Sequence, residues 1–132
     1  MQKIQNRAAR IVKKISRHER ITPVLRELHW LPVEQRVKFK VAVLTYKSLN
    51  EMAPQYLTEL IELYRPSRHL RSSSSHLLVV NRTNTKSFGN KSFIHTAAEV
   101  WNALQIDIKL SKSLDIFKSR LKTTLFEEYF AK

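Results

Sequence analysis

Six cations recur in the first 17 residues at spacings that a helix would gather on one side. No acid interrupts them before Glu19, and Lys and Arg bind phosphate oxygens through charge-assisted hydrogen bonds. The pattern predicts a helix over residues 2–17 with a phosphate-binding face and an apolar face that packs. The predicted contact residues are Lys3, Arg7, Arg10, Lys13, Lys14 and Arg17. The predicted packing stripe is Ile4, Ala8, Ile11, Val12 and Ile15.

A second group of cations occupies residues 63–98, a segment that contains no Asp or Glu. Its predicted phosphate contacts are Arg65, Arg68, Arg71, Arg82, Lys86 and Lys91. Phe88 and Phe93 are interleaved with them, as in proteins that stack bases of single strands, although core packing is the more ordinary role of Phe93. A narrow basic stripe on a third predicted helix adds Arg36, Lys40 and Lys47.

Residues for catalysis are missing by type and by spacing. Asp107 and Asp115 are the only two aspartates, whereas two-metal chemistry requires clustered carboxylates. The chain has no cysteine, and none of its five histidines stands three or four residues from another. The sequence therefore predicts a non-enzymatic protein with no catalytic residue, no metal ion, no cofactor and no small-molecule substrate.

The charge of the whole chain indicates its partners. The 132 residues carry a formal net charge of +13, with 12 Lys and Arg against 3 acids in residues 1–50 alone. This excess favours a polyanion, with RNA or DNA first and an anionic membrane surface second. The apolar runs are far shorter than the ~20 residues of a membrane-spanning helix. We expect an intracellular location, in the nucleus, the cytoplasm or both, with a mitochondrial presequence at residues 1–18 as the alternative.

The elements that would position these residues are mostly helices. The stretch "LHWLPVEQRVKFKV" (28–41) alternates locally like a strand, but the helical period explains more of its residues. Further helices are expected from residue 22 and over residues 32–49, 54–64, 96–104 and 113–130. The fold class is mainly α, about five to six helices, with a small β hairpin or meander near residues 77–95. One domain, 1–132, would comprise a basic helical half (1–64), a basic loop with short strands (65–95) and C-terminal helices (96–132).

Seven segments in order resemble one family. They are "QNRAARIV" (5–12), "ITPVLRELHWLPVEQRVKFKV" (21–41), "TYKSLNEMAPQYL" (45–57), "PSRHLRSS" (66–73), "FGNKSF" (88–93), "WNAL" (101–104) and "FKSRLKTTLF" (117–126). The chain resembles the C-terminal region of the reading frame of non-LTR, LINE-type retrotransposons of the jockey-like group. It departs from that pattern at Asn81 and Gln105, where family members often have proline.

The resemblance implies a place beside a polymerase, downstream of the reverse transcriptase domain. The polymerase and endonuclease motifs of that family are absent from this chain, so no catalytic residue is carried over. A basic region there would contact template RNA or target DNA, with the upstream reverse transcriptase domain as a further partner. Three alternatives stay open: a helical protein-docking module centred on residues 32–49, a membrane-surface helix at residues 1–18, or a truncated retroelement fragment without a function of its own.

Overall fold

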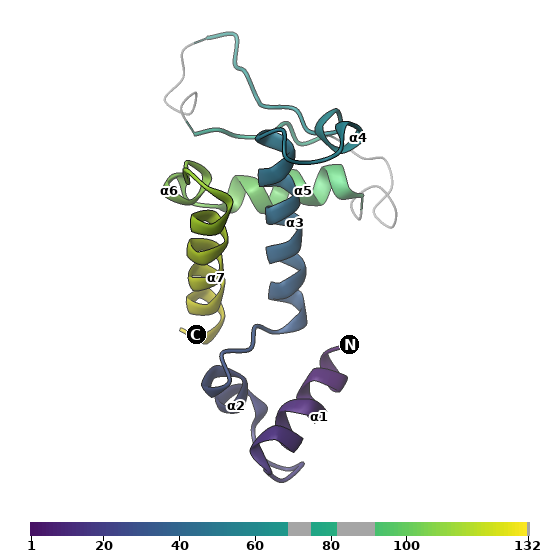
Figure 1. Ribbon diagram of the computed structural model, residues 1–132, viewed down its shortest axis with the longest axis vertical. Helices are drawn as coiled ribbons and strands as arrows, with labels where there is room; N and C mark the ends of the chain where they lie inside the picture. Colours follow the sequence, from purple (N-terminus) through teal and green to yellow (C-terminus); the bar gives the residue numbers. More distant parts are fainter. Residues whose placement is uncertain (69–74, 82–91, 132) are drawn as a thin grey trace. The chain divides into compact units, whose positions relative to one another are not determined.

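The structure is a computed structural model that describes residues 1–68, 75–81 and 92–131 (Figure 1). Its helices are α1 (Gln2–Lys13), α2 (Ile21–Glu27), α3 (Val33–Leu49), α4 (Gln55–Thr58), α5 (Phe93–Ala103), α6 (Ile106–Lys109) and α7 (Leu114–Phe130). The chain forms two compact units, which we describe separately. Unit 1 comprises Met1–Phe39 with Leu121–Lys132, and unit 2 comprises Lys40–Arg120.

The prediction of a mainly α protein is confirmed, whereas the predicted β hairpin is not seen among the described residues. In the described part of the chain, one antiparallel bridge joins Leu63 to Leu78, with a 2.8 Å hydrogen bond from Tyr64 N–H to the Leu77 carbonyl. The predicted meander is wrong at its end, because α5 already begins at Phe93. Residues 82–91, which include both predicted turns, lie outside the described residues.

Local signals explain where most of the long helices begin and end. Helix α3 begins directly after Pro32, as predicted. Helix α1 stops at Lys13, four residues earlier than expected, because Lys14 turns left-handed with φ 52°. Helix α4 covers only four residues of the predicted 54–64, since the chain then extends to pair with the segment around Leu78. The short helix α6 was not predicted.

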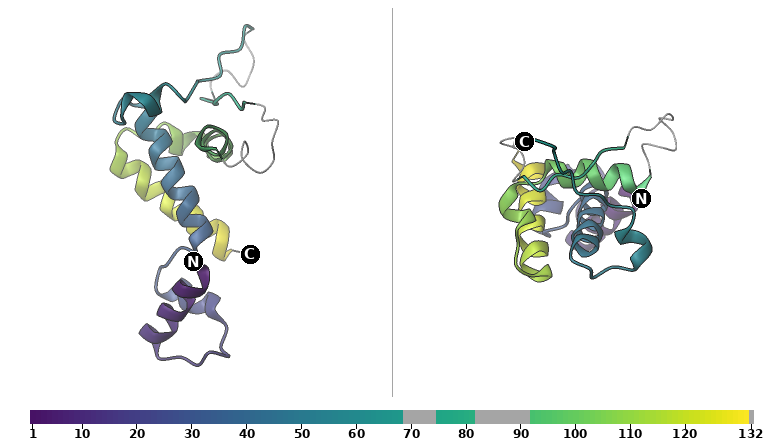
Figure 2. Two further views of the ribbon diagram at one scale, coloured as in Figure 1. Left: turned by 90° about the vertical axis from the view of Figure 1, so that its right-hand side faces the viewer. Right: turned by 90° about the horizontal axis from the view of Figure 1, so that it is seen from above.

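Unit 1 is built around the contact between α1 and α2, which lie side by side in Figures 1 and 2. Ala9, Val24 and Leu25 form its buried centre. Helix α2 ends in a Schellman motif, in which Trp30 N–H donates to the Leu25 carbonyl at 2.9 Å and His29 adopts φ 52°. The partly buried residues packed on this centre are Ile15, Ile21, Leu28, Trp30 and Phe130.

Unit 2 has an aromatic core. Tyr46 of α3 stacks on Phe117 of α7 with ring centroids 4.3 Å apart, and its hydroxyl donates to the Ser111 carbonyl at 2.7 Å. Trp101 of α5 is buried against the same phenylalanine, and its indole N–H donates to the His76 carbonyl at 2.8 Å. These bonds satisfy polar groups that burial would otherwise leave unpaired, so the core specifies one arrangement.

Candidate nucleic-acid interface

Helix α1 is attached to the rest of unit 1 through a strip formed by Gln2, Gln5 and Ala9. The Gln2 side-chain oxygen accepts the backbone N–H of Val33 at 2.8 Å, and the Gln5 amide donates to the Leu31 carbonyl at 2.8 Å. Ala9, which is fully buried, has a side chain small enough for α2 to approach closely. The amphipathic helix therefore docks through a strip of Gln2, Gln5 and Ala9, which is neither the predicted apolar stripe nor the row of exposed cations.

The expected packing of the α1 apolar stripe is wrong for its most hydrophobic members. Ile4 is 71% exposed, Ile11 76% and Val12 57%. A residue of the stripe is buried only where it faces α2. The side of α1 that faces α2 is the side of Ala9, so Ile4 and Ile11 point elsewhere. Ile15, in the turn beyond the helix, is the one stripe residue that packs on the buried centre.

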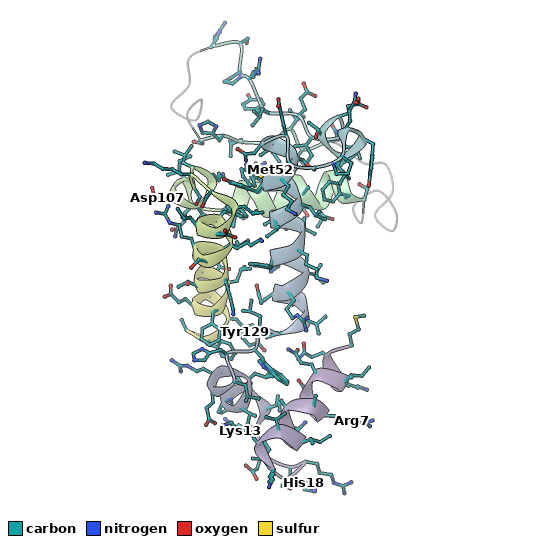
Figure 3. The ribbon with its side chains drawn as sticks, in the orientation of Figure 1. Arg7, Lys13, His18, Met52, Asp107 and Tyr129 are labelled. Carbon is teal, nitrogen blue, oxygen red and sulfur yellow. The ribbon has the colours of Figure 1, made fainter. Side chains whose placement is uncertain are left out.

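The six cations expected on one side of α1 are divided by this docking. Lys3 and Arg7 are four residues apart, so they lie in one row on the helix, and both are exposed. Lys14 and Arg17 follow in the turn after the helix and are exposed too. Figure 3 shows Arg7 and Lys13 on opposite sides of α1, with Lys13 on the side of α2.

Arg10 and Lys13 serve the internal contacts of unit 1. Lys13 forms an ion pair with Glu27 of α2. Arg10 donates through Nη2 to the Glu19 carbonyl at 3.1 Å, while its Nε is buried and finds no partner. Both groups are thus committed to holding the α1–α2 connection, which leaves four exposed cations of the six.

Unit 1 also holds exposed cations that were not singled out from the sequence. Arg20 and Arg26 are exposed and line a shallow surface depression that also includes His29 and Phe130. The depression has a mixed character, because Glu27 lies in its wall. The sequence signal was present, since residues 20–26 contain no acid, but the approach of Phe130 arises only in the folded chain.

The remaining predicted contacts are scattered over the two units. Arg36 is exposed in unit 1, and Lys40 is exposed in unit 2, where Lys47 is half-buried. Arg65 and Arg68 are exposed in unit 2. The other members of the second group, Arg71, Arg82, Lys86 and Lys91, lie outside the described residues, as does Phe88.

One cation is buried instead of presented to solvent. Lys109 is 8% exposed, and its ammonium group donates to the Ser75 carbonyl at 3.3 Å. Burial lowers the pKa of Lys109 below its usual 10.5, because desolvation disfavours the charged form. It lies in the wall of a pocket in unit 2 that Trp101 and His76 also line. Its position is unsuited to contact with a polymer backbone.

Metal binding and membrane spanning find no support in the part of the chain that the structure describes. Its His, Asp and Glu side chains form no group of three or more that could hold a metal ion. None of the helices in residues 1–68, 75–81 and 92–131 combines the length and apolar character needed to cross a bilayer.

Comparison with known proteins adds no relative. No protein-family model matches the chain, and neither a curated protein nor a solved structure is significantly similar to it. The fold and the distribution of charge are therefore the observations on which a function can be argued.

Proposed function

We propose that the chain is a non-enzymatic nucleic-acid-binding region that contacts RNA or DNA phosphates through exposed cations of unit 1. The observation that carries this proposal is the acid-free exposed side of α1, with Lys3 and Arg7 in one row and Lys14 and Arg17 directly after it. Because α1 contains no Asp or Glu, Lys3 and Arg7 create a positive potential that a phosphate backbone offsets. Lys14 and Arg17 extend this potential beyond the helix, where the Glu19 carboxylate, which accepts the Ser16 N–H at 3.1 Å, partly offsets it next to Arg17.

The expected binding is weakly selective for sequence. Phosphate contacts position a protein on a nucleic acid but carry no direct information about the bases. Ion pairing within unit 1 removes Lys13 from the contact set, and the hydrogen bond to the Glu19 carbonyl ties Arg10 to the protein. We therefore assign the contact to the four exposed cations and expect Arg10 and Lys13 to affect stability more than affinity.

The origin that fits this function is the C-terminal accessory region of a non-LTR retrotransposon reverse transcriptase. What supports it is the ordered set of seven segments together with the high positive charge. The upstream reverse transcriptase domain would then be the protein partner, and the location would be intracellular. Reading the genomic DNA upstream of this frame tests the origin: a polymerase frame supports it, and its absence from every genomic copy argues against it.

The binding function is tested by a salt titration of the full chain with single-stranded RNA and with duplex DNA. Four phosphate contacts to a single strand predict a log–log slope of about −3, from roughly −0.7 for each contact. A slope near zero, or no binding at low salt, would exclude the proposal.

A pair of charge-matched variants locates the contact. Lys3→Gln/Arg7→Gln removes two exposed cations of α1, and Lys112→Gln/Lys122→Gln removes two exposed lysines elsewhere. The first variant should reduce the slope by about 1.4, whereas the second should leave it nearly unchanged. Equal reductions would show that affinity follows net charge and that α1 is not the interface.

A further inference from the structure

The exposed apolar row of α1 has no partner in unit 1. Ile4 and Ile11 are seven residues apart, so they lie on one line of the helix with Ala8 between them, and Val12 lies beside that line. The two isoleucines are 71% and 76% exposed. Helix α1 is strongly amphipathic, yet it docks through Gln2, Gln5 and Ala9 instead of through this apolar row. When a helix exposes a row of large apolar side chains to water, we infer that another surface covers this row in the functional state.

The charges next to this row favour an anionic cover. Arg7 is three residues from Ile4 and four from Ile11, which places its guanidinium row directly alongside the apolar row. Lys3 extends the same basic row, and α1 contains no Asp or Glu. Long basic side chains beside apolar ones can keep their charges at a polar boundary while their methylene stems follow the apolar surface.

A second copy of the chain is the less favourable occupant. Each copy carries a formal charge of +13, and antiparallel packing of two α1 helices through their apolar rows would bring the two basic rows to the same side. Such a dimer brings like charges together, which costs free energy at low salt. A lipid surface with acidic headgroups accommodates both rows at once.

We propose that α1 is an interfacial helix that binds an anionic lipid surface. Ile4, Ile11 and Val12 would enter the boundary between headgroups and acyl chains, while Lys3 and Arg7 contact headgroup phosphates or carboxylates. The polar contacts of Gln2 and Gln5 stay inside unit 1, so the helix can bind without unfolding its docked side. With one short helix, binding is reversible and weak. This function goes beyond nucleic-acid binding but shares its cations.

The test is co-sedimentation of the full chain with vesicles. We expect binding to vesicles of phosphatidylcholine with phosphatidylserine, and none to phosphatidylcholine alone. Ile4→Gln/Ile11→Gln keeps every charge and replaces side chains that face solvent, so the fold should persist. This variant should bind the anionic vesicles about tenfold more weakly. Its affinity for RNA should stay within about twofold, because the phosphate contacts remain.

Matched variants separate the apolar contribution from the electrostatic one. Ile116→Gln makes the same change at a half-exposed position of α7 and should leave vesicle binding unchanged. Lys3→Gln/Arg7→Gln should weaken both vesicle and RNA binding. RNA should also displace the wild-type chain from vesicles, because both ligands use the same cations.

Three results would overturn the proposal. Undiminished binding of Ile4→Gln/Ile11→Gln to anionic vesicles would mean attraction by charge alone. A concentration-dependent dimer in sedimentation equilibrium, lost in that variant, would assign the row to a second copy. The third result is that the wild type fails to bind anionic vesicles but binds a helical peptide that carries Glu beside an apolar stripe. If that binding is saturable and depends on Ile4 and Ile11, the apolar row belongs to an acidic protein helix. None of these results bears on whether the chain binds RNA.

Discussion

Gln2 accepts the backbone N–H of Val33 through its side-chain oxygen at 2.8 Å, which ties the first turn of α1 to the first turn of α3. The first N–H groups of a helix have no partner within it, so a side chain from another helix here acts as the cap. The same glutamine donates to Asn6 at 2.8 Å. The bond between Gln2 and Val33 fixes which side of α1 faces the rest of unit 1, and hence which side is free for a ligand.

Replacing Gln2 by Ala should destabilise the protein by about 1 kcal/mol, because Val33 N–H loses its acceptor. Urea unfolding followed by circular dichroism measures the change. Gln55→Ala is the control, since the Gln55 amide donates to the exposed Glu59 four residues later, at the end of α4. The control should shift stability by less than about 0.5 kcal/mol. Equal shifts in the two variants would contradict the capping role.

Tyr46→Phe should cost about 1–2 kcal/mol, because the Ser111 carbonyl then loses its buried donor. The aromatic stacking on Phe117 survives this change, so the measurement isolates the hydroxyl group. Tyr56→Phe removes the same hydroxyl from a side chain that is 65% exposed and should have almost no effect. Unfolding midpoints that fall equally in both variants would argue against the buried bond.

Glu51→Gly should raise stability by about 0.5–1 kcal/mol, because Glu51 holds φ 56° after α3 and a Cβ disfavours that conformation. The turn itself is closed by Met52 N–H, which donates to the Lys47 carbonyl at 2.8 Å. Glu59→Gly, at φ −66°, should lower stability. Glu51→Gln removes the charge and keeps the Cβ, so a gain of similar size in this variant would assign the effect to charge.

Lys109→Met should stabilise the protein by about 1 kcal/mol at neutral pH, because it replaces a buried charge with an apolar side chain of similar length. Burial lowers the pKa of Lys109 in the folded state below 10.5, so the unfolded state binds more protons between the two values. Because of Lys109, the free energy of unfolding of the wild type therefore rises with pH across that window. The difference in this free energy between Lys109→Met and the wild type becomes smaller. Urea unfolding from neutral pH to above pH 10.5 follows the difference. A difference that stays constant with pH, or that exposed Lys112→Met reproduces, would contradict burial as its cause.

The long helices were predictable because their signals are local. Pro32 precedes α3, and Ser113 caps α7 by accepting the N–H of Ile116 at 3.3 Å. By contrast, the pairing of Leu63 with Leu78 joins residues 15 positions apart in sequence, and no local pattern indicates which extended segment will be the partner.

The candidate interface was predictable in composition and not in arrangement. The sequence alone determined that α1 would be amphipathic, acid-free and basic, because those properties follow from residue type and helical period. Only the tertiary structure decided that α1 would dock through Gln2 and Ala9 instead of its apolar stripe, and that Lys13 would pair with Glu27. The physical reason is that periodicity separates two faces of a helix, while the face that is buried depends on the shape and hydrogen-bonding groups of the neighbouring helices.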